Sequence, residues 1–348
     1  DTGKAALAGY RDLPGIRIQV FYPESGTSEI QRLQMATQEG ENLAVWAVQG
    51  NFDDAQTGVK KAFADRELEK ALDAQGVRLS SANSINWGRL VPQIVYYFAA
   101  YGRLVREGEI NLGQKVDFCV PTGNFGDILA GYYAKRMGLP VGRLVCASNK
   151  NNLLTDFFAT GCYDARREFY KTDSPSMDIL ISSNLERMLY HLLGSDEAVR
   201  LRMDQLARTG RYTIEEQDLN RLKEVFDAGF ASDEEGAGQI RTCFEKDGYL
   251  CDTHTAVAFK VAREYMARQA EPNPMVVLST ASPFKFPAAV LGALGQKAPQ
   301  DDFEALHLLE GVSGCKAPLS LRQLQEMPVR FDRVIRPEQI KAAALGEL

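Results

Sequence analysis

A glycine-bearing turn between an apolar run and an apolar helix pattern restricts the fold more than any other feature. The run Val116-Asp117-Phe118-Cys119-Val120 has the length of a buried strand, and the pattern after it predicts a helix over about 126–137. Gly123 and Gly126 allow backbone N–H groups to converge beside the start of that helix, which carries partial positive charge. We therefore predict a phosphate site at Gly123–Gly126. An ordinary strand-to-helix turn is the alternative at this point.

Strand and helix patterns alternate along the first eighty residues. β-branched and aromatic residues predict a strand at 17–22, and an apolar run predicts another at 43–48. Ser28, followed by Gln31, has the pattern of a capping box that opens a helix through about Gln38. Such alternation predicts a parallel sheet flanked by helices, an α/β fold. The other elements expected here are helices at 4–11, 52–64 and 66–74 and a short strand at 77–80.

A boundary near Ser81–Asn83 separates a smaller βαβ domain, residues 1–83, from a larger α/β domain, residues 84–299. The segment at about 184–247 has few strand signals, and we expect a helical insertion there. The tail, residues 300–348, is expected to form short elements that pack on the larger domain. Within the larger domain we also expect helices at about 85–106 and 253–268 and strands at 143–147 and 275–279.

Composition argues against several classes of protein. The formal net charge of −6 is unlike that of a general nucleic-acid binder, although it allows a local anion site. No apolar run is long enough to span a bilayer. The six cysteines contain no C-x-x-C pair and the three histidines are scattered, so we expect reduced thiols, a cytoplasmic location and no metal site. An oligomer is compatible with all of this.

Hydroxyl groups follow a second apolar strand, in Leu278-Ser279-Thr280-Ala281-Ser282-Pro283-Phe284-Lys285-Phe286. They would lie at the carboxyl end of a parallel sheet, where ligands bind in open α/β sheets. Ser282 before Pro283 equally fits a helix N-cap, and the cap is the favoured interpretation of this segment alone.

Two further segments have the composition of anion sites. Asn83, Ser84 and Asn86 surround a predicted helix start, with Arg89 one turn further on. A capped helix with a surface arginine is the commoner outcome for such a segment. The opening Asp1-Thr2-Gly3-Lys4 suits a carboxylate at a helix start, or is only a cap. Together, four such junctions predict an enzyme that binds a phosphate-bearing cofactor.

At these residues the chain resembles the threonine synthase family, over nearly all of its 348 residues. The resemblance rests on these stretches: Asp1-Thr2-Gly3, Tyr22-Pro23-Glu24, Gln49-Gly50-Asn51-Phe52-Asp53-Asp54, Ser81-Ala82-Asn83-Ser84-Ile85-Asn86-Trp87-Gly88-Arg89, Gly123-Asn124-Phe125-Gly126-Asp127, Ser174-Pro175-Ser176-Met177-Asp178-Ile179 and Asp252-Thr253-His254-Thr255-Ala256-Val257. It implies a fold-type II, tryptophan synthase β-like enzyme that uses pyridoxal 5′-phosphate. The implied reaction converts O-phospho-L-homoserine and water to L-threonine and phosphate, the last step of threonine biosynthesis.

The resemblance also implies roles for individual residues. Gly123, Asn124, Phe125 and Gly126 would hold the cofactor phosphate, and Thr280, with Ser279 or Ser282 as substitutes, would contact the ring nitrogen. Asn83, Asn86 and Arg89 are the candidates for the substrate phosphate, and Thr2 and Gly3 for the substrate carboxylate.

The family's Schiff-base lysine precedes the loop that Asp1-Thr2-Gly3 resembles. We therefore expect that lysine, and the N-terminal part of the fold, upstream of Asp1. Lys4 and Lys285 are the candidates within the chain, and we assign the role to neither. We expect the 348 residues alone to be inactive.

Two alternatives stay open. Another fold-type II enzyme, such as a dehydratase or cysteine synthase, tends to have a run of glycines where this chain has Asn124-Phe125, and has no use for a substrate-phosphate site at Arg89. A non-catalytic module that binds a phosphorylated metabolite is the second alternative.

Overall fold

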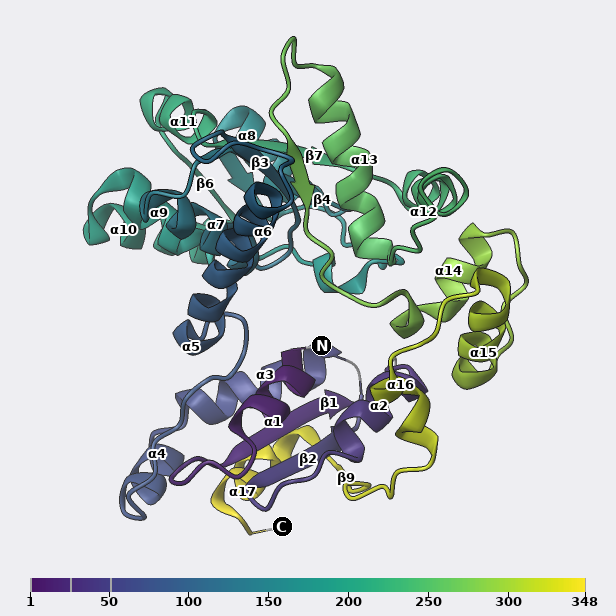
Figure 1. Ribbon diagram of the computed structural model, residues 1–348. Coiled ribbons are helices and arrows are strands. Elements are labelled where there is room, and N and C mark those ends of the chain that lie inside the picture. The colour runs from purple at the N-terminus through teal and green to yellow at the C-terminus, as the bar shows by residue number, and fades with distance from the viewer. Residues whose placement is uncertain (1, 26, 51, 348) are drawn as a thin grey trace. The chain divides into compact units, whose positions relative to one another are not determined.

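The computed structural model describes residues 2–25, 27–50 and 52–347, and the chain divides into two compact units. The first comprises Asp1–Asn83, Gln300–Glu310 and Lys316–Leu348, and the second comprises Ser84–Pro299 and Gly311–Cys315. The first unit is therefore built from both ends of the sequence, which are purple and yellow in Figure 1.

The first unit contains a parallel three-stranded sheet in the order β1-β2-β9. Its strands are β1 (Ile18–Pro23), β2 (Leu43–Val48) and β9 (Val334–Ile335). The α-helices that begin in this unit are α1 (Thr2–Tyr10), α2 (Glu29–Ala36), α3 (Phe52–Ala64), α4 (Arg66–Asp73), α15 (Asp302–Ser313), α16 (Leu319–Arg322) and α17 (Ile340–Leu345). Two 3₁₀-helices accompany them, η4 (Gln323–Gln325) and η5 (Pro337–Gln339).

The capping box predicted at the start of α2 is confirmed. The Ser28 hydroxyl accepts a hydrogen bond from the Gln31 amide at 3.3 Å, and the Gln31 side chain accepts one from the Ser28 amide at 3.4 Å. The helix ends at Ala36, two residues before the predicted end.

The third strand of this sheet comes from the tail, and two predictions are wrong as a result. Residues 77–80 form no strand, and the tail belongs largely to the first unit rather than packing on the larger domain. The reason is burial: Ile335 is buried with Trp46 and Val48, whereas Leu79 is 38% exposed. The apolar pair Val334–Ile335 was too short to be recognised as a strand from the sequence.

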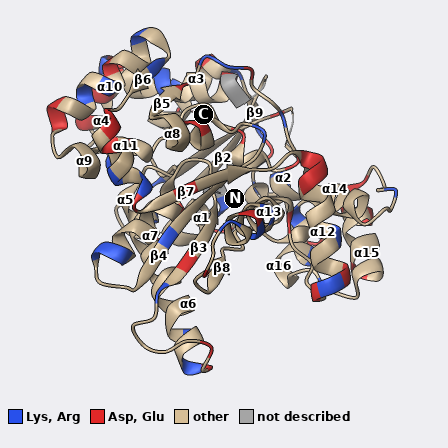
Figure 2. Ribbon diagram, turned by 90° about the horizontal axis from the view of Figure 1, so that it is seen from above, with Lys and Arg blue, Asp and Glu red and all other residues tan. Residues whose placement is uncertain are grey.

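The second unit is built on a parallel four-stranded sheet in the order β7-β4-β3-β8. Its strands are β3 (Val116–Pro121), β4 (Val141–Ser148), β7 (Phe226–Phe230) and β8 (Met275–Val277). Every residue of β3 is buried, as expected of a central parallel strand covered on both faces. Figure 2 shows these strands mostly tan, with most of the charged residues on the surrounding helices.

Alternate residues of β3 and β4 pack on opposite faces of this sheet. Phe118, Val120 and Leu144 belong to a core shared with α6 (Ile94–Arg106) and α7 (Gly126–Arg136). Cys119 and Val145 pack instead with α13 (Thr253–Ala267). The remaining helices of this unit are α5 (Trp87–Leu90), η1 (Val91–Gln93), α8 (Leu153–Thr160), η2 (Pro175–Met177), α9 (Leu185–Leu193), α10 (Asp196–Thr209), α11 (Glu216–Lys223), α12 (Asp233–Asp247), η3 (Pro283–Lys285) and α14 (Pro287–Ala293).

Two sequence predictions for this unit need correction. The segment 184–247 is not a purely helical insertion, because β7 pairs with β4 in the main sheet and Leu185 and Leu222 lie in the core. Asp, Ala and Gly within β7 have low strand propensity, which hid it. The segment also contributes β6 (Arg211–Thr213), which pairs antiparallel with β5 (Cys162–Asp164). The helix predicted at 85–106 is divided into α5, η1 and α6, with Pro92 in η1.

None of the helices that the described residues form combines the length and the apolar character needed to cross a membrane.

Candidate active site

The turn between β3 and α7 is held by a buried aromatic ring. Phe125 has φ 58° and ψ 14°, a left-handed conformation that is uncommon for residues other than glycine. Its side chain is only 1% exposed and contacts Phe158 and Phe226, with ring centroids 6.1 and 5.7 Å away. Burial of this ring stabilises the conformation and explains an aromatic residue between the two glycines of the turn.

The carbonyl groups of the turn are bound by the segment 182–184. The Ser182 hydroxyl donates to the Gly123 carbonyl at 2.8 Å, and the Asn184 side chain donates to the Asn124 carbonyl at 2.9 Å. The Asn184 amide also donates to the Asn124 carbonyl, at 3.1 Å. Within the part of the chain that the structure describes, the amides of Gly123–Gly126 donate no hydrogen bond. The turn therefore has its donors available at the start of a helix, the arrangement that binds a phosphate.

Gly123 is required by the close approach of a second loop. A Cβ atom at this position would lie 2.5 Å from the carbonyl oxygen of Ser176, a backbone atom that a rotamer change cannot move away. The residues present thus fit a phosphate group, with small residues and unbonded amides at the carboxyl end of β3.

Thr280 lies at the same edge of the sheet. It follows β8, which pairs with β3 in parallel, so the carboxyl ends of both strands lie on one side. Thr280 is exposed and has no hydrogen-bond partner among the described residues. Ser279, by contrast, accepts from the Tyr249 hydroxyl at 3.1 Å, and Ser282 accepts from the Phe284 amide at 3.4 Å. Of the three hydroxyl groups, Thr280 is the one that makes no hydrogen bond to another described residue.

The segment Ser84–Arg89 is joined to the turn through Asn184. The Asn184 side chain donates to the Ser84 carbonyl at 3.0 Å as well as to Asn124. Asn86 caps α5 by accepting from the Gly88 amide at 2.9 Å, the capped helix considered as the alternative from the sequence. Arg89 is half-buried one turn further along.

The other predicted site residues lie in the first unit. Asn83 is exposed and is the last residue of that unit's first segment. Thr2 and Gly3 lie in α1, but the Thr2 side chain, like Asp1 as a whole, lies outside the described residues.

Of the two lysines considered for the Schiff base, one is hydrogen-bonded within the first unit and the other is half-buried. The Lys4 ammonium donates to the Gln38 side chain within the first unit. Lys285 is half-buried in η3, and burial lowers its pKa while the Asp252 carboxylate opposes the shift.

The sequence did not reveal a buried pair, Asp252 and His254, that holds the loop facing the turn. The Asp252 carboxylate accepts from His254 Nδ1 at 2.9 Å, and His254 Nε2 accepts from the Ser176 amide at 3.1 Å. Ser176 is the residue whose carbonyl faces Gly123. Asp252 before an apolar helix could have been recognised as an N-cap, which it is, but its bond to His254 and onward to Ser176 depends on tertiary structure.

A second missed cluster holds the loop that contains Ser176. Asp178 Oδ1 accepts from the side-chain amides of Asn149 at 2.8 Å and Asn151 at 3.0 Å, and from the Thr172 hydroxyl at 2.7 Å. Asn149 and Asn151 follow β4 directly. The carboxyl end of β4 is therefore used to fix the neighbouring loop.

The carboxyl group of Asp127, in the first turn of α7, has a raised pKa. Burial raises its pKa from 3.8 to about 7, against the opposing effect of the Tyr97 hydroxyl, which donates to its carboxylate at 3.2 Å. Because the folded-state pKa is raised, the stability associated with the protonated form is complete below 3.8 and is lost as the pH rises through about 7.

Asp127→Asn should therefore unfold at a higher temperature than the unmodified chain at pH 8, by roughly 2–4 °C for each kcal/mol of destabilisation removed. The difference should vanish below pH 3.8. Thermal unfolding followed by circular dichroism measures it, with Asp204→Asn on the exposed face of α10 as the control. An equal rise in unfolding temperature at pH 8 and below pH 3.8 would contradict this interpretation.

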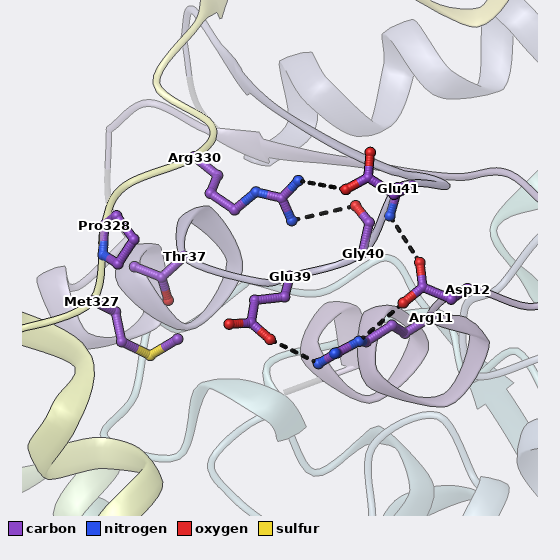
Figure 3. A pocket seen from close by; sticks show the side chains of 9 residues that line it. All are labelled: Arg11, Asp12, Thr37, Glu39, Gly40, Glu41, Met327, Pro328 and Arg330. Atoms are coloured by element: carbon purple, nitrogen blue, oxygen red, sulfur yellow. Dashed lines mark hydrogen bonds and ion pairs between the residues drawn. The ribbon is translucent and has the colours of Figure 1, made fainter.

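A cavity of about 370 Å³ in the first unit is a poor candidate for the same ligand (Figure 3). It lies at the amino ends of β1, β2 and β9, opposite the edge where parallel sheets bind ligands. Arg11 contacts Asp12 and Glu39 at 3.2 and 3.1 Å, and Arg330 faces Glu41 at 3.7 Å. Its cations are thus already paired with carboxylates, which would repel a phosphate.

The parallel α/β sheet with a glycine turn after its central strand has the architecture of the fold-type II enzymes, the class that depends on pyridoxal phosphate. A family model described as "Threonine synthase, C-terminal" matches residues 255–343. Threonine synthase from Pseudomonas aeruginosa is 41% identical over 93% of this chain and 67% of its own length. Threonine synthase-like 1 from Macaca fascicularis is 41% identical over 92% of this chain and 44% of its own length.

Among solved structures, pyridoxal-phosphate-bound threonine synthase from Brucella melitensis is 39% identical, with a TM-score of 0.84 over 100% of this chain and 68% of that one. The chain belongs to the threonine synthase family. It spans less than half of the threonine synthase-like 1 relative and about two thirds of the threonine synthases.

Proposed function

We propose that the protein to which these residues belong converts O-phospho-L-homoserine and water to L-threonine and phosphate, with pyridoxal phosphate as cofactor. The single observation that supports this most is the unbonded set of amides at Gly123–Gly126, at the carboxyl end of β3. Membership of the threonine synthase family supports the same proposal.

The site residues divide between cofactor and substrate. Gly123, Asn124, Phe125 and Gly126 hold the cofactor phosphate through backbone amides, and the Thr280 hydroxyl contacts the ring nitrogen. A neutral hydroxyl group at this position leaves the ring without the full charge that a carboxylate would stabilise. When bound, pyridoxal phosphate supplies an electron sink for carbanions formed on the amino acid. Arg89, with Asn86 and Asn83, binds the substrate phosphate, and Thr2 and Gly3 the substrate carboxylate.

We further propose that the 348 residues alone give no turnover, because Lys4 is bonded to Gln38 and Lys285 lies in the segment assigned to the ring nitrogen, so that neither matches the family's Schiff-base lysine. Incubation with pyridoxal phosphate, borohydride reduction and peptide mapping tests this. Stoichiometric labelling of either lysine would overturn the proposal, and trace labelling spread over surface lysines would support it.

The protein that contains these residues should release inorganic phosphate from O-phospho-L-homoserine and form threonine in equal amount. Ammonia from serine or threonine without phosphate release would favour a dehydratase-like enzyme. Binding of the phosphorylated substrate with no product of either kind would favour a non-catalytic module. We also propose a cytoplasmic location, on the basis of the reduced cysteines.

A further inference from the structure

We propose that Asn184 is a positioning residue that couples the turn Gly123–Gly126 to the segment Ser84–Arg89. A phosphate bound at the turn would then also order that segment. The proposal rests on the proposed function, because it takes the turn as the cofactor-phosphate site.

The hydrogen bonds of Asn184 connect two segments that are far apart in sequence. Its side-chain nitrogen donates to the Ser84 carbonyl at 3.0 Å and to the Asn124 carbonyl at 2.9 Å. These two bonds use both hydrogens of the amide group. Its backbone amide donates to the Asn124 carbonyl at 3.1 Å. Asn184 therefore fixes the distance between the carbonyls of Ser84 and Asn124.

Arg187 completes the connection on the acceptor side. One guanidinium nitrogen donates to the Asn184 side-chain oxygen, and another donates to the Ile85 carbonyl at 2.8 Å. The Asn184 side chain is thus held on its oxygen and its nitrogen, and Arg187 holds the same segment a second time. No rotation about the side-chain amide preserves these bonds, so the amide orientation is determined by its partners.

Burial keeps water from taking over the hydrogen bonds of Asn184. Asn184 is 0% exposed, so water cannot replace its amide group without a rearrangement of the site. Its side-chain nitrogen would lie 3.5 Å from a Cβ atom placed on Gly126, so it also borders the start of α7. Loss of this group removes the Asn184 donor to the Ser84 carbonyl, and it leaves the Asn124 carbonyl with the Asn184 backbone amide as its remaining donor from this residue. The direct side-chain connection between the two segments is then lost, and only the Arg187 bond to Ile85 and the Asn184 backbone bond to Asn124 remain.

The test uses 4′-deoxypyridoxine 5′-phosphate, which has the cofactor's phosphate and ring but no aldehyde to react with lysine. Calorimetry measures its affinity for the chain and for Asn184→Ala. Hydrogen–deuterium exchange measures the amides of residues 84–90 with and without the compound. Asn184→Asp, which keeps the acceptor for Arg187 and lacks the amide donors, is the second variant should Asn184→Ala not fold. Asn220→Ala, on the exposed face of α11, is the matched control.

We expect about tenfold weaker binding in the Asn184 variants, the change produced by loss of a buried hydrogen-bond partner. We also expect the compound to slow exchange in residues 84–90 of the unmodified chain and of Asn220→Ala but not of the Asn184 variants. Unchanged affinity, or slowed exchange that persists in the Asn184 variants, would overturn the coupling alone. Absence of binding to the unmodified chain would overturn the phosphate site and, with it, the coupling.

Discussion

Gly123→Ala should lower the affinity for 4′-deoxypyridoxine 5′-phosphate by about a hundredfold or more and destabilise the second unit by roughly 1–3 kcal/mol. The added Cβ atom would lie 2.5 Å from the Ser176 carbonyl oxygen, so the turn or the facing loop must move. The facing loop is held by the Asp178 cluster and by His254, so the turn is the part expected to move. Its amides would then no longer converge.

Gly102→Ala is the matched control for this substitution. Gly102 lies on the exposed side of α6, where an added Cβ would have no atom within 4 Å. Alanine in a helix interior should stabilise the protein by up to about 1 kcal/mol, with no effect on ligand affinity. Calorimetric titration of both variants measures the contrast. Equal affinity of Gly123→Ala and Gly102→Ala would refute the assignment of the turn.

Asp252→Ala should be the most destabilising single change at the site, by about 3–5 kcal/mol. The carboxylate is fully buried and accepts from His254 Nδ1 at 2.9 Å, from the His254 amide at 2.9 Å and from the Thr255 hydroxyl. Its removal leaves a buried imidazole donor and the first turn of α13 without an acceptor. The Ser176 loop, which His254 supports, should loosen as a consequence.

Urea unfolding measures this effect, followed by the fluorescence of Trp87 in a Trp46→Phe background, so that the signal reports on the second unit alone. Asp204→Ala, exposed on α10, is the control. Burial raises the pKa of Asp252, but hydrogen bonds from His254 and Thr255 outweigh it and the net pKa is lowered. The stabilising effect is therefore present above the ordinary value of 3.8 and is lost as the pH falls. A loss below 1 kcal/mol at pH 7 would contradict the supporting role.

The helices, strands and turns that have a clear local sequence pattern could be predicted. The capping box at Ser28, the buried strand at β3 and the glycine turn after it all depend on residues close together in the chain. Such local patterns determine strand, turn and helix directly. The parallel arrangement follows, because helices connect successive strands.

The parts that could not be predicted depend on pairing across long separations. β9 is a strand only because β2 offers a partner nearly three hundred residues earlier, and β7 is recognisable only beside β4. Asn184 appears in the sequence as a polar residue before a helix, and nothing local shows that it joins Ser84 to Asn124. The candidate donors could therefore be named from the sequence, whereas the residues that position them could not.

The central claim is that the amides of the turn bind a phosphate, and one backbone signal tests it. Phe125–Gly126 is the only Phe-Gly pair in the sequence, so labelling with carbonyl-¹³C phenylalanine and ¹⁵N glycine isolates the Gly126 amide in a filtered NMR spectrum. Titration with 4′-deoxypyridoxine 5′-phosphate should shift this signal, and 4′-deoxypyridoxine without the phosphate should not. A Gly126 signal that stays in place while calorimetry shows the phosphate compound bound would contradict the claim.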